Sequence, residues 1–177
     1  MTTSEQWIEE AAALKNKMLA AGGKAGIAKR EQVAGLSGLQ TMQAMLDGKF
    51  PFPHIAETLD FMLFSVSEGE AIFQGTPSIS HMNPLGSVHG GWYGTLLDSA
   101  MGCAVHTTMP VGRGYTTADY TVNLMRGVKL GVPYRVIGKV LHAGKQLAMA
   151  EAKIVDAEGK LYAHGTTTCL VFELPKT

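Results

Sequence analysis

The stretch that most constrains this chain is Asn-Pro-Leu-Gly-Ser-Val-His-Gly-Gly at residues 83–91, together with the apolar run that continues to about residue 109. Asparagine before proline opens turns, because proline fixes one backbone dihedral and the asparagine side chain bonds the backbone beyond it. Ser87 is then placed to act as the N-cap of a long helix. The amides near His89, Gly90 and Gly91 would lie in the first helical turn without intrahelical partners. The segment therefore predicts a turn that leads into a buried helix with free N–H groups at its start.

A helix start of this kind suits an oxygen atom that becomes negatively charged. The free N–H groups and the helix dipole both place partial positive charge there. Glycine also allows a ligand to approach the backbone closely. We therefore expect the backbone N–H of Gly90 to serve as an oxyanion donor. The alternative that needs no ligand is a permissive glycine where the chain turns tightly into the helix.

Asp98 is the only acidic residue in this apolar run, and it follows His89 by nine positions. That spacing is roughly 13 Å along a helix axis and about half a turn around it, so the two cannot meet on one helix. They meet if a second copy of the helix runs antiparallel beside the first, which predicts a two-fold dimer. A buried acid is costly unless it is hydrogen-bonded or used, and a paired structural carboxylate is the alternative. Small residues on the same stripe of the helix leave room beside this carboxylate: Gly91, Gly94, Thr95 and Gly102.

The spacing of Asn83, of His-Gly-Gly at 89–91 and of Asp98 resembles the signature of hotdog-fold acyl-CoA thioesterases of the phenylacetyl-CoA (PaaI-like) type. The resemblance covers roughly residues 55–173 and implies a long central helix wrapped by an antiparallel sheet. It also implies that Asp98 is the catalytic carboxylate, acting either as general base on water or as nucleophile on the thioester. Some hotdog thioesterases carry glutamate at a comparable place, and aspartate favours the phenylacetyl-CoA type.

Three further side chains belong to the expected catalytic group. Asn83 would hold the water or the thioester carbonyl, or would only close the turn, or both. His89 would orient the thioester or act as a structural donor at the helix start. Thr117 lies where the related enzymes place a small hydroxyl residue, often serine. The neighbouring Thr116 could be the equivalent residue instead, if the register is shifted by one. The alternative without a catalytic role is that a threonine on a strand is ordinarily a β-former.

Basic residues gather between residues 113 and 145, where there are six of them and a single acid. This excess suits the phosphates of coenzyme A, and a solvated strand face is the plain alternative. Arg126, just after the third expected strand, is the best individual candidate, and residues 142–145 form a loop that can touch the nucleotide. The expected contacts to substrate and coenzyme A come from Gly91, Arg126, His142, Gly144 and Lys145.

The remaining pattern predicts an α+β domain built around the long helix. Residues 4–20 and 38–46 are typical of helices, so we expect residues 1–54 to form a helical extension that packs on a main domain at 55–177. A lid over the substrate is the functional alternative for this extension. About six antiparallel strands are expected, at 61–66, 70–76, 115–125, 134–141, 147–156 and 161–174. Within the third strand, strict alternation puts Tyr120 on one face and Thr117 on the other.

Composition excludes several other classes. The formal net charge of zero argues against nucleic acid as a partner. Cys103 and Cys169 lie in apolar runs without metal-ligand neighbours, which argues against a disulfide framework and for a reducing interior. The six histidines are scattered, so no metal is expected. No signal peptide is visible, and His89, Asp98 and His106 interrupt the apolar run, so a buried helix and a cytoplasmic protein are expected rather than a membrane span.

The resemblance, together with these features, implies hydrolysis of an aryl, short or medium acyl-CoA to a free acid and coenzyme A, with no cofactor beyond the coenzyme A of the substrate. The thioester carbonyl would bind the Gly90 amide of one subunit, and Asp98 of the other would drive the reaction. We expect a homodimer and a further dimer of dimers. The alternatives are an acyl-CoA binding or sensing module without turnover, and a hotdog dehydratase, whose His and acid arrangement differs. Trp92 and Tyr93 are candidates for an aromatic acyl pocket, or for core or dimer contacts.

Overall fold

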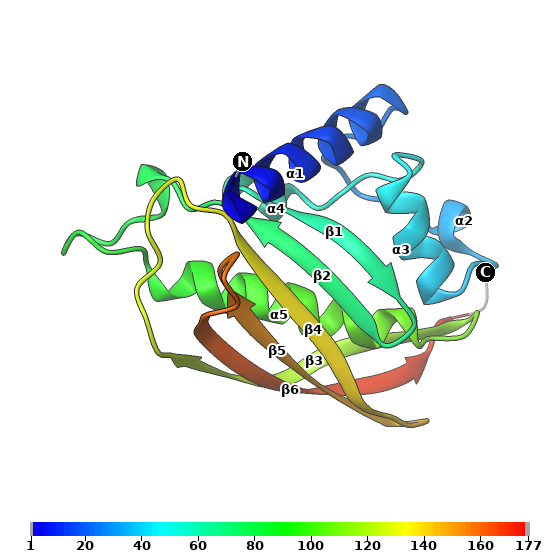
Figure 1. The fold of residues 1–177 in the computed structure, drawn as a ribbon. Helices are drawn as coiled ribbons and strands as arrows, with labels where there is room; N and C mark the ends of the chain where they lie inside the picture. Colours follow the sequence, from blue (N-terminus) through cyan, green and yellow to red (C-terminus); the bar gives the residue numbers. More distant parts are fainter. Residues whose placement is uncertain (1, 176–177) are drawn as a thin grey trace.

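A computed structural model describes residues 2–175 of the chain. One sheet with the strand order β1-β2-β4-β5-β6-β3 wraps around the long helix α5 (Gly90–Thr107), as Figure 1 shows. All of its strand pairs are antiparallel. This arrangement confirms the predicted α+β hotdog layout. The strands are β1 (Phe61–Ser67), β2 (Glu70–Gly75), β3 (Arg113–Leu124), β4 (Tyr134–Ala143), β5 (Leu147–Val155) and β6 (Leu161–Glu173).

Helix α5 is the centre of the core, because its apolar side chains face the sheet and are fully buried. Leu96, Leu97 and Met101 are among them, and each such side chain contributes about 1.5–3 kcal/mol on transfer from water. The helix lies very close to β4. A Cβ atom at Gly138 would stand 2.2 Å from the backbone oxygen of Ala100. The sheet can therefore wrap this tightly only with glycine at that position.

Strand β3 is an edge of the sheet and carries a bulge. It pairs with β6 on one side, and the structure between residues 2 and 175 offers it no strand on the other. The register shifts between Thr117 and Asp119. An extra residue in one strand moves the following side chains to the other face. Thr117 and Tyr120 therefore both face α5, and the prediction that they lie on opposite faces is wrong.

Four helices precede the sheet: α1 (Thr3–Ala20), α2 (Arg30–Val33), α3 (Gly38–Leu46) and α4 (His54–Thr58). The helical patterns at 4–20 and 38–46 predicted α1 and α3. The sequence did not indicate α2 and α4, because four or five residues are too few to display a helical period. Figure 1 shows α1, drawn in dark blue, beside β1 and β2.

Arg135 on β4 anchors α1 to the sheet. Its guanidinium lies 4.3 Å from the ring centre of Trp7 and 3.9 Å from that of Phe64. It also pairs with Glu10 of α1. Beside it, the side chain of Gln74 donates a hydrogen bond of 2.9 Å to the backbone oxygen of Trp7. A cavity of about 390 Å³ lies between α1, α3, α4 and the first two strands, and none of the predicted site residues lines it.

Candidate active site

His89, and not Ser87, is the N-cap of α5. The Nδ1 atom of His89 accepts a hydrogen bond of 2.9 Å from the N–H of Gly91. A ring nitrogen that accepts carries no proton, so the proton of the neutral ring is on Nε2, which remains free to donate. The prediction of Ser87 as N-cap is wrong: Ser87 belongs to the turn that Asn83 closes, and the helix begins only at Gly90, two residues too late for a Ser87 cap.

Asn83 closes the turn before the helix. Its Oδ1 atom accepts the N–H groups of Leu85, at 2.9 Å, and of Ser87, at 3.3 Å. Its Nδ2 atom donates to the hydroxyl of Ser87 at 2.8 Å. The turn-closing role is therefore present, and one Nδ2 hydrogen is left for another acceptor. A contact of Asn83 with water or with a carbonyl stays a prediction.

The N–H of Gly90 is the free amide at the start of α5. The N–H of Gly91 goes to the His89 ring and that of Trp92 goes to the His89 backbone oxygen at 3.0 Å. For the Gly90 N–H, no acceptor exists among residues 2–175. Gly90 is exposed, so a ligand can reach it. Among backbone amides the helix start thus offers the N–H of Gly90, whereas the N–H of Gly91 is already bonded to the His89 ring.

Asp98 lies halfway along α5 and is partly buried. The hydroxyl of Thr117 donates to its Oδ1 atom at 3.1 Å. Of the two adjacent threonines, Thr117 is therefore the one that contacts the carboxylate, whereas Thr116 is exposed; the catalytic role of Thr117 stays a prediction. Burial raises the pKa of the nearby Cys103 thiol to about 12, and the negative charge of Asp98 adds to the rise.

Glycines spaced by four residues let the side chains of β3 pack along α5. A Cβ at Gly90 would lie 3.5 Å from Leu124, and one at Gly94 would lie 3.6 Å from the hydroxyl of Tyr120. Further along, a Cβ at Gly102 would lie 2.8 Å from the hydroxyl of Tyr115. Residues four apart share one face of a helix, so Asp98 belongs to the same row. The carboxylate of Asp98 therefore lies in a row of glycines on the face of α5 that packs against the edge strand β3.

Tyr115 is a residue of this site that the sequence did not single out. Burial, followed by the nearby Cys103, Cys169 and Asp98, raises its pKa well above the ordinary value, so the phenol keeps its proton. No acceptor for its hydroxyl is found within residues 2–175. The sequence did hold one indication of its place: Tyr115 lies two residues before Thr117, and residues two apart on a strand share a face.

Trp92 and Tyr93 do not line the site. They are 2% and 3% exposed and lie in the core. The indole N–H of Trp92 donates to the backbone oxygen of Leu59 at 2.9 Å. The hydroxyl of Tyr93 accepts the N–H of Val128 at 2.8 Å. The core alternative for these two aromatic residues is the one that the structure supports.

The basic residues between 113 and 145 do not form one patch within the chain. Arg135 is taken up by α1, and Lys139 pairs with Glu70 at 3.0 Å. The guanidinium of Arg113 donates to the backbone oxygen of Lys145, which ties β3 to the β4–β5 hairpin. A run of cations in the sequence is a poor guide here, because tertiary neighbours take up three of the six: two pair with acids and the third binds a backbone oxygen.

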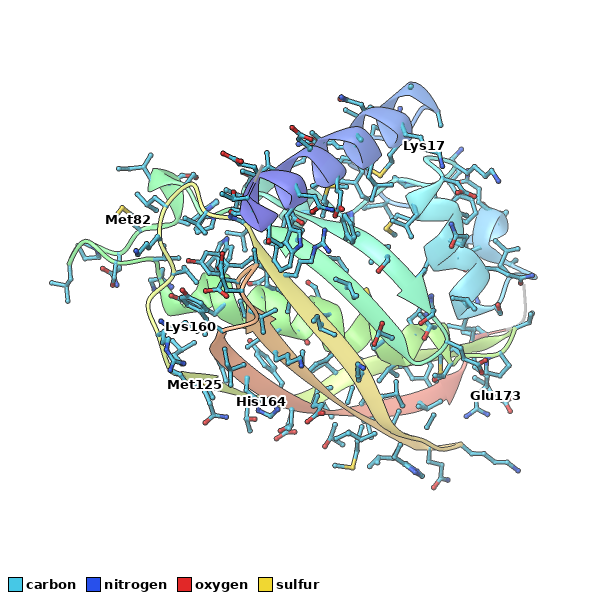
Figure 2. All side chains as sticks on the ribbon, in the orientation of Figure 1. Lys17, Met82, Met125, Lys160, His164 and Glu173 are labelled. Atoms are coloured by element: carbon cyan, nitrogen blue, oxygen red, sulfur yellow. The ribbon has the colours of Figure 1, made fainter. Side chains whose placement is uncertain are left out.

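Arg126 and the hairpin at 142–145 lie at opposite ends of the sheet. Arg126 lies two residues beyond the end of β3, whereas the hairpin lies beside the first residue of that strand, and 12 residues of strand span roughly 35 Å. Figure 2 labels Met125 and Glu173 at these two ends. His142 and Lys145 are exposed, and the amide of Gly144 bonds the oxygen of Leu147 at 2.9 Å. One chain therefore cannot bring Arg126 and this hairpin to the same nucleotide.

Two absences are confined to the described part of the chain. None of the helices between residues 2 and 175 has the length and the apolar character needed to cross a lipid bilayer. Over the same residues, no three His, Cys, Asp or Glu side chains gather as they would around a metal ion.

A sheet wrapped around one helix, with a free amide at the helix start and a carboxylate at its middle, defines a hotdog-fold protein with a hydrolase-like site. The thioesterase superfamily profile matches residues 85–163. Human acyl-coenzyme A thioesterase 13 is 32% identical over 107 residues, which cover 60% of this chain and 76% of the human protein. The chain therefore belongs to the acyl-coenzyme A thioesterases of the thioesterase superfamily, as the resemblance at residues 83–98 implied.

Solved structures agree on the fold. PaaI from the phenylacetic acid degradation operon of Escherichia coli matches with a TM-score of 0.66 at 24% identity, over 79% of this chain and 95% of its own. A phenylacetic acid degradation-related protein of Ralstonia eutropha matches with a TM-score of 0.66 at 25% identity, over 73% of this chain and 98% of its own.

Proposed function

We propose that the chain hydrolyses aryl or short- to medium-chain acyl-CoA thioesters in a site shared by two copies of the chain. The Gly90 N–H of one subunit binds the thioester carbonyl oxygen, and Asp98 of the other attacks the carbonyl carbon or removes a proton from an attacking water. The oxyanion that forms is stabilised by the Gly90 N–H and then collapses to expel the thiolate of coenzyme A. Where Asp98 is the nucleophile, water then hydrolyses the mixed anhydride that Asp98 forms, and by either route the products are the free acid and coenzyme A.

The observation that carries this proposal is the free N–H of Gly90, eight residues before Asp98 on the same helix. Eight residues correspond to roughly 12 Å, which is too far for one thioester group to contact both. A reacting carbonyl needs its donor and its nucleophile within about 3 Å of their reaction partners. Two antiparallel copies of α5 supply both groups at one place.

The open edge of β3 supports a two-fold partner. An unpaired strand edge is a template for another strand. Two large apolar side chains of β3 are exposed: Tyr120 by 45% and Leu124 by 51%. Pairing two β3 strands antiparallel would bring opposite ends of the two sheets together. Arg126 would then lie near the 142–145 hairpin of the second copy, where the phosphates of one coenzyme A could reach both.

Side chains around the carboxylate complete the proposed chemistry. Thr117 holds one oxygen of Asp98 and leaves the other free to act. The Nε2–H of His89 donates to the thioester near the oxyanion donor, and the bond from Gly91 to Nδ1, which leaves the proton on Nε2, supports this role. Asn83 shapes the turn and offers its remaining N–H to the water or the carbonyl. Coenzyme A as the carrier agrees with two neighbours of the same fold, from Streptococcus pneumoniae and Streptococcus mutans, which were solved with coenzyme A and with acetyl-CoA.

Two inactive variants test the shared site. Asp98→Asn removes the carboxylate. Gly90→Pro removes only the N–H, because proline is well accepted at the first position of a helix and His89 already has the extended conformation that precedes proline. Each variant alone should lose roughly 10²-fold or more in kcat for an accepted acyl-CoA, measured as thiol release. Asp119→Asn, an exposed acid on β3, is the matched control and should keep its activity.

Mixing the two inactive variants under subunit exchange distinguishes a shared site from a site within one chain. A mixed dimer has one site with both Asp98 and the Gly90 N–H intact, so activity should return to about a quarter of the unmodified value. No recovery despite proven exchange would contradict the shared site. Full turnover by Asp98→Asn alone would contradict the assigned chemistry. A screen of aryl, short and long acyl-CoAs with the unmodified protein then tests the substrate range.

A further inference from the structure

A buried histidine, His81, lies in the segment that leads to α5 and has both ring nitrogens bonded. It is 6% exposed. Its Nδ1 atom accepts the N–H of Ser78 at 3.0 Å. Its Nε2 atom lies 3.1 Å from the backbone oxygen of Thr58, and since that oxygen can only accept, Nε2 carries the proton. The ring is therefore held in one orientation and one tautomer.

The backbone of His81 fixes the residue before Gly90. The N–H of His89 donates to the His81 backbone oxygen at 2.8 Å. Between them, Met82 and Val88 form a β-bridge, and the N–H of Asn83 bonds the oxygen of Ser87 at 2.8 Å. The segment from 81 to 89 is thus a closed hairpin-like turn. The ring of His81 attaches this turn to the end of α4, while Val88, which is 7% exposed, packs the turn on the core.

The chain just after Gly90 is also attached to the end of α4. Trp92, two residues after it, donates its indole N–H to the backbone oxygen of Leu59. Thr58 is the last residue of α4 and Leu59 is its C-cap. Carbonyl groups at a helix end have no intrahelical donor, so they are available to bind side chains of this kind. The end of α4 consequently holds the chain just before and just after the proposed oxyanion donor.

We infer that His81 is a positioning residue for the Gly90 N–H, which it aims by tying the turn at 81–89 to the end of α4. The inference rests on the proposed function, because it presumes that Gly90 donates to the thioester. An oxyanion donor is effective only if it is oriented before the reaction, and a displacement of about 1 Å costs on the order of 10²-fold in rate. The end of α4 thereby acts on the site from a distance, without touching substrate.

Kinetics of three substitutions test the role. His81→Ala removes both ring bonds and should lower kcat roughly 10- to 100-fold, while KM for the acyl-CoA changes less than about 3-fold. His81→Asn keeps an acceptor near Ser78 but loses the bond to Thr58, and it should fall in the same direction. His81→Gln reaches far enough to donate to Thr58 and should recover much of kcat. An Asn variant as active as the unmodified protein would overturn the link through α4, even if the Ala variant does not fold.

A matched control separates aiming from simple loosening. The hydroxyl of Thr107, at the far end of α5, accepts the N–H of Gly69 at 2.8 Å and is buried. Thr107→Val breaks a comparable bond and should lower the melting temperature while leaving kcat within about 2-fold. An equal fall of kcat in both variants at matched stability would overturn the inference.

A double-mutant cycle with Gly90→Pro gives the sharpest result. If His81 acts only through the Gly90 N–H, then His81→Ala should cost less than about 2-fold once that N–H is gone. Independent, multiplying losses would overturn the positioning role. The two proposals also fail separately. Full kcat in His81→Ala removes only this inference, whereas full kcat in Gly90→Pro removes the proposed oxyanion donor itself.

Discussion

The hydroxyl of Thr117 on β3 donates a hydrogen bond of 3.1 Å to the carboxylate of Asp98 on α5. The bulge beside Thr117 makes this contact compatible with the rest of the strand. Without the extra residue in the strand, Thr117 could face the helix only if Tyr120 and Val122 pointed away from it. The edge strand therefore positions a polar hydroxyl at the carboxylate and apolar side chains along the remaining helix.

We expect Thr117→Val to lower kcat/KM by about 10-fold or more, because a hydrogen bond to a charged group contributes about 1.5–3 kcal/mol. Valine keeps the shape of threonine and removes only the hydroxyl. Thr117→Ser is the matched variant and should stay within about 3-fold of the unmodified protein, since it keeps the donor. Steady-state thiol release measures both. Equal activity in all three proteins would show that the hydroxyl does not assist the carboxylate.

A second prediction concerns the fit between Gly102 and Tyr115. Gly102→Ala places a methyl group 2.8 Å from the Tyr115 hydroxyl and should lower the free energy of unfolding by about 1–3 kcal/mol. Removing that oxygen with Tyr115→Phe should recover about 1 kcal/mol of the loss in the double variant. Urea unfolding of the four proteins measures this coupling. Strictly additive losses would mean that the methyl group strains another contact instead.

A third prediction uses two glycines with ordinary backbone angles and opposite surroundings. Gly138→Ala should destabilise by about 3 kcal/mol or more, because its Cβ would stand 2.2 Å from the backbone oxygen of Ala100 and the helix would have to move. Gly127→Ala meets nothing within 4 Å, so it should be neutral or stabilise by up to about 1 kcal/mol. Urea midpoints compare them directly. Similar midpoints for both variants would contradict the close approach of α5 to β4.

A fourth prediction follows from the pKa of Cys103, which burial raises from 9.0 to about 12. As pH rises above 9.0, the unfolded chain loses this proton first, so the folded state becomes less favoured. The free energy of unfolding should fall by up to about 1.4 kcal/mol per pH unit in this range, and Cys103→Ala should reduce the slope. Urea unfolding between about pH 8 and about pH 10.5 measures it. An identical slope in the variant would rule out a buried thiol as the cause.

Much of the fold could be predicted because its pattern is local. Alternation and hairpin turns gave the six strands to within two residues at either end, from β1 (Phe61–Ser67) to β6 (Leu161–Glu173). That Gly90 and Asp98 lie on one helix could be predicted for a related reason, since it follows from their spacing; their catalytic roles stay predictions. The bulge at Ala118 has no such local mark, and it alone reversed the expected face of Thr117.

Contacts between distant segments set the limit of the sequence reading. Nothing near Arg135 indicates that Glu10 and Trp7 of α1 will occupy it. The same holds for His81, whose partner Thr58 ends a helix too short to display a period. Ser87 has a side chain suited to an N-cap, but it lies in the turn closed by Asn83, and the helix begins only after it. In each case the deciding partner lies on another element or in a turn whose closure the residue types leave open.

The open edge of β3 determines how this protein tolerates change. Strand pairing along an edge uses main-chain groups, so it does not depend on which side chains the strand carries. Substitutions of exposed residues such as Asn123 or Thr121 should change how well a second strand fits against this edge, but they leave the main-chain groups able to pair. Only a residue without an N–H, such as proline, takes a hydrogen-bonding group away from that edge. The exposed positions of β3 can therefore vary widely in side-chain chemistry, whereas Thr117 and the side chains packed on α5 cannot, and proline is excluded where the strand pairs.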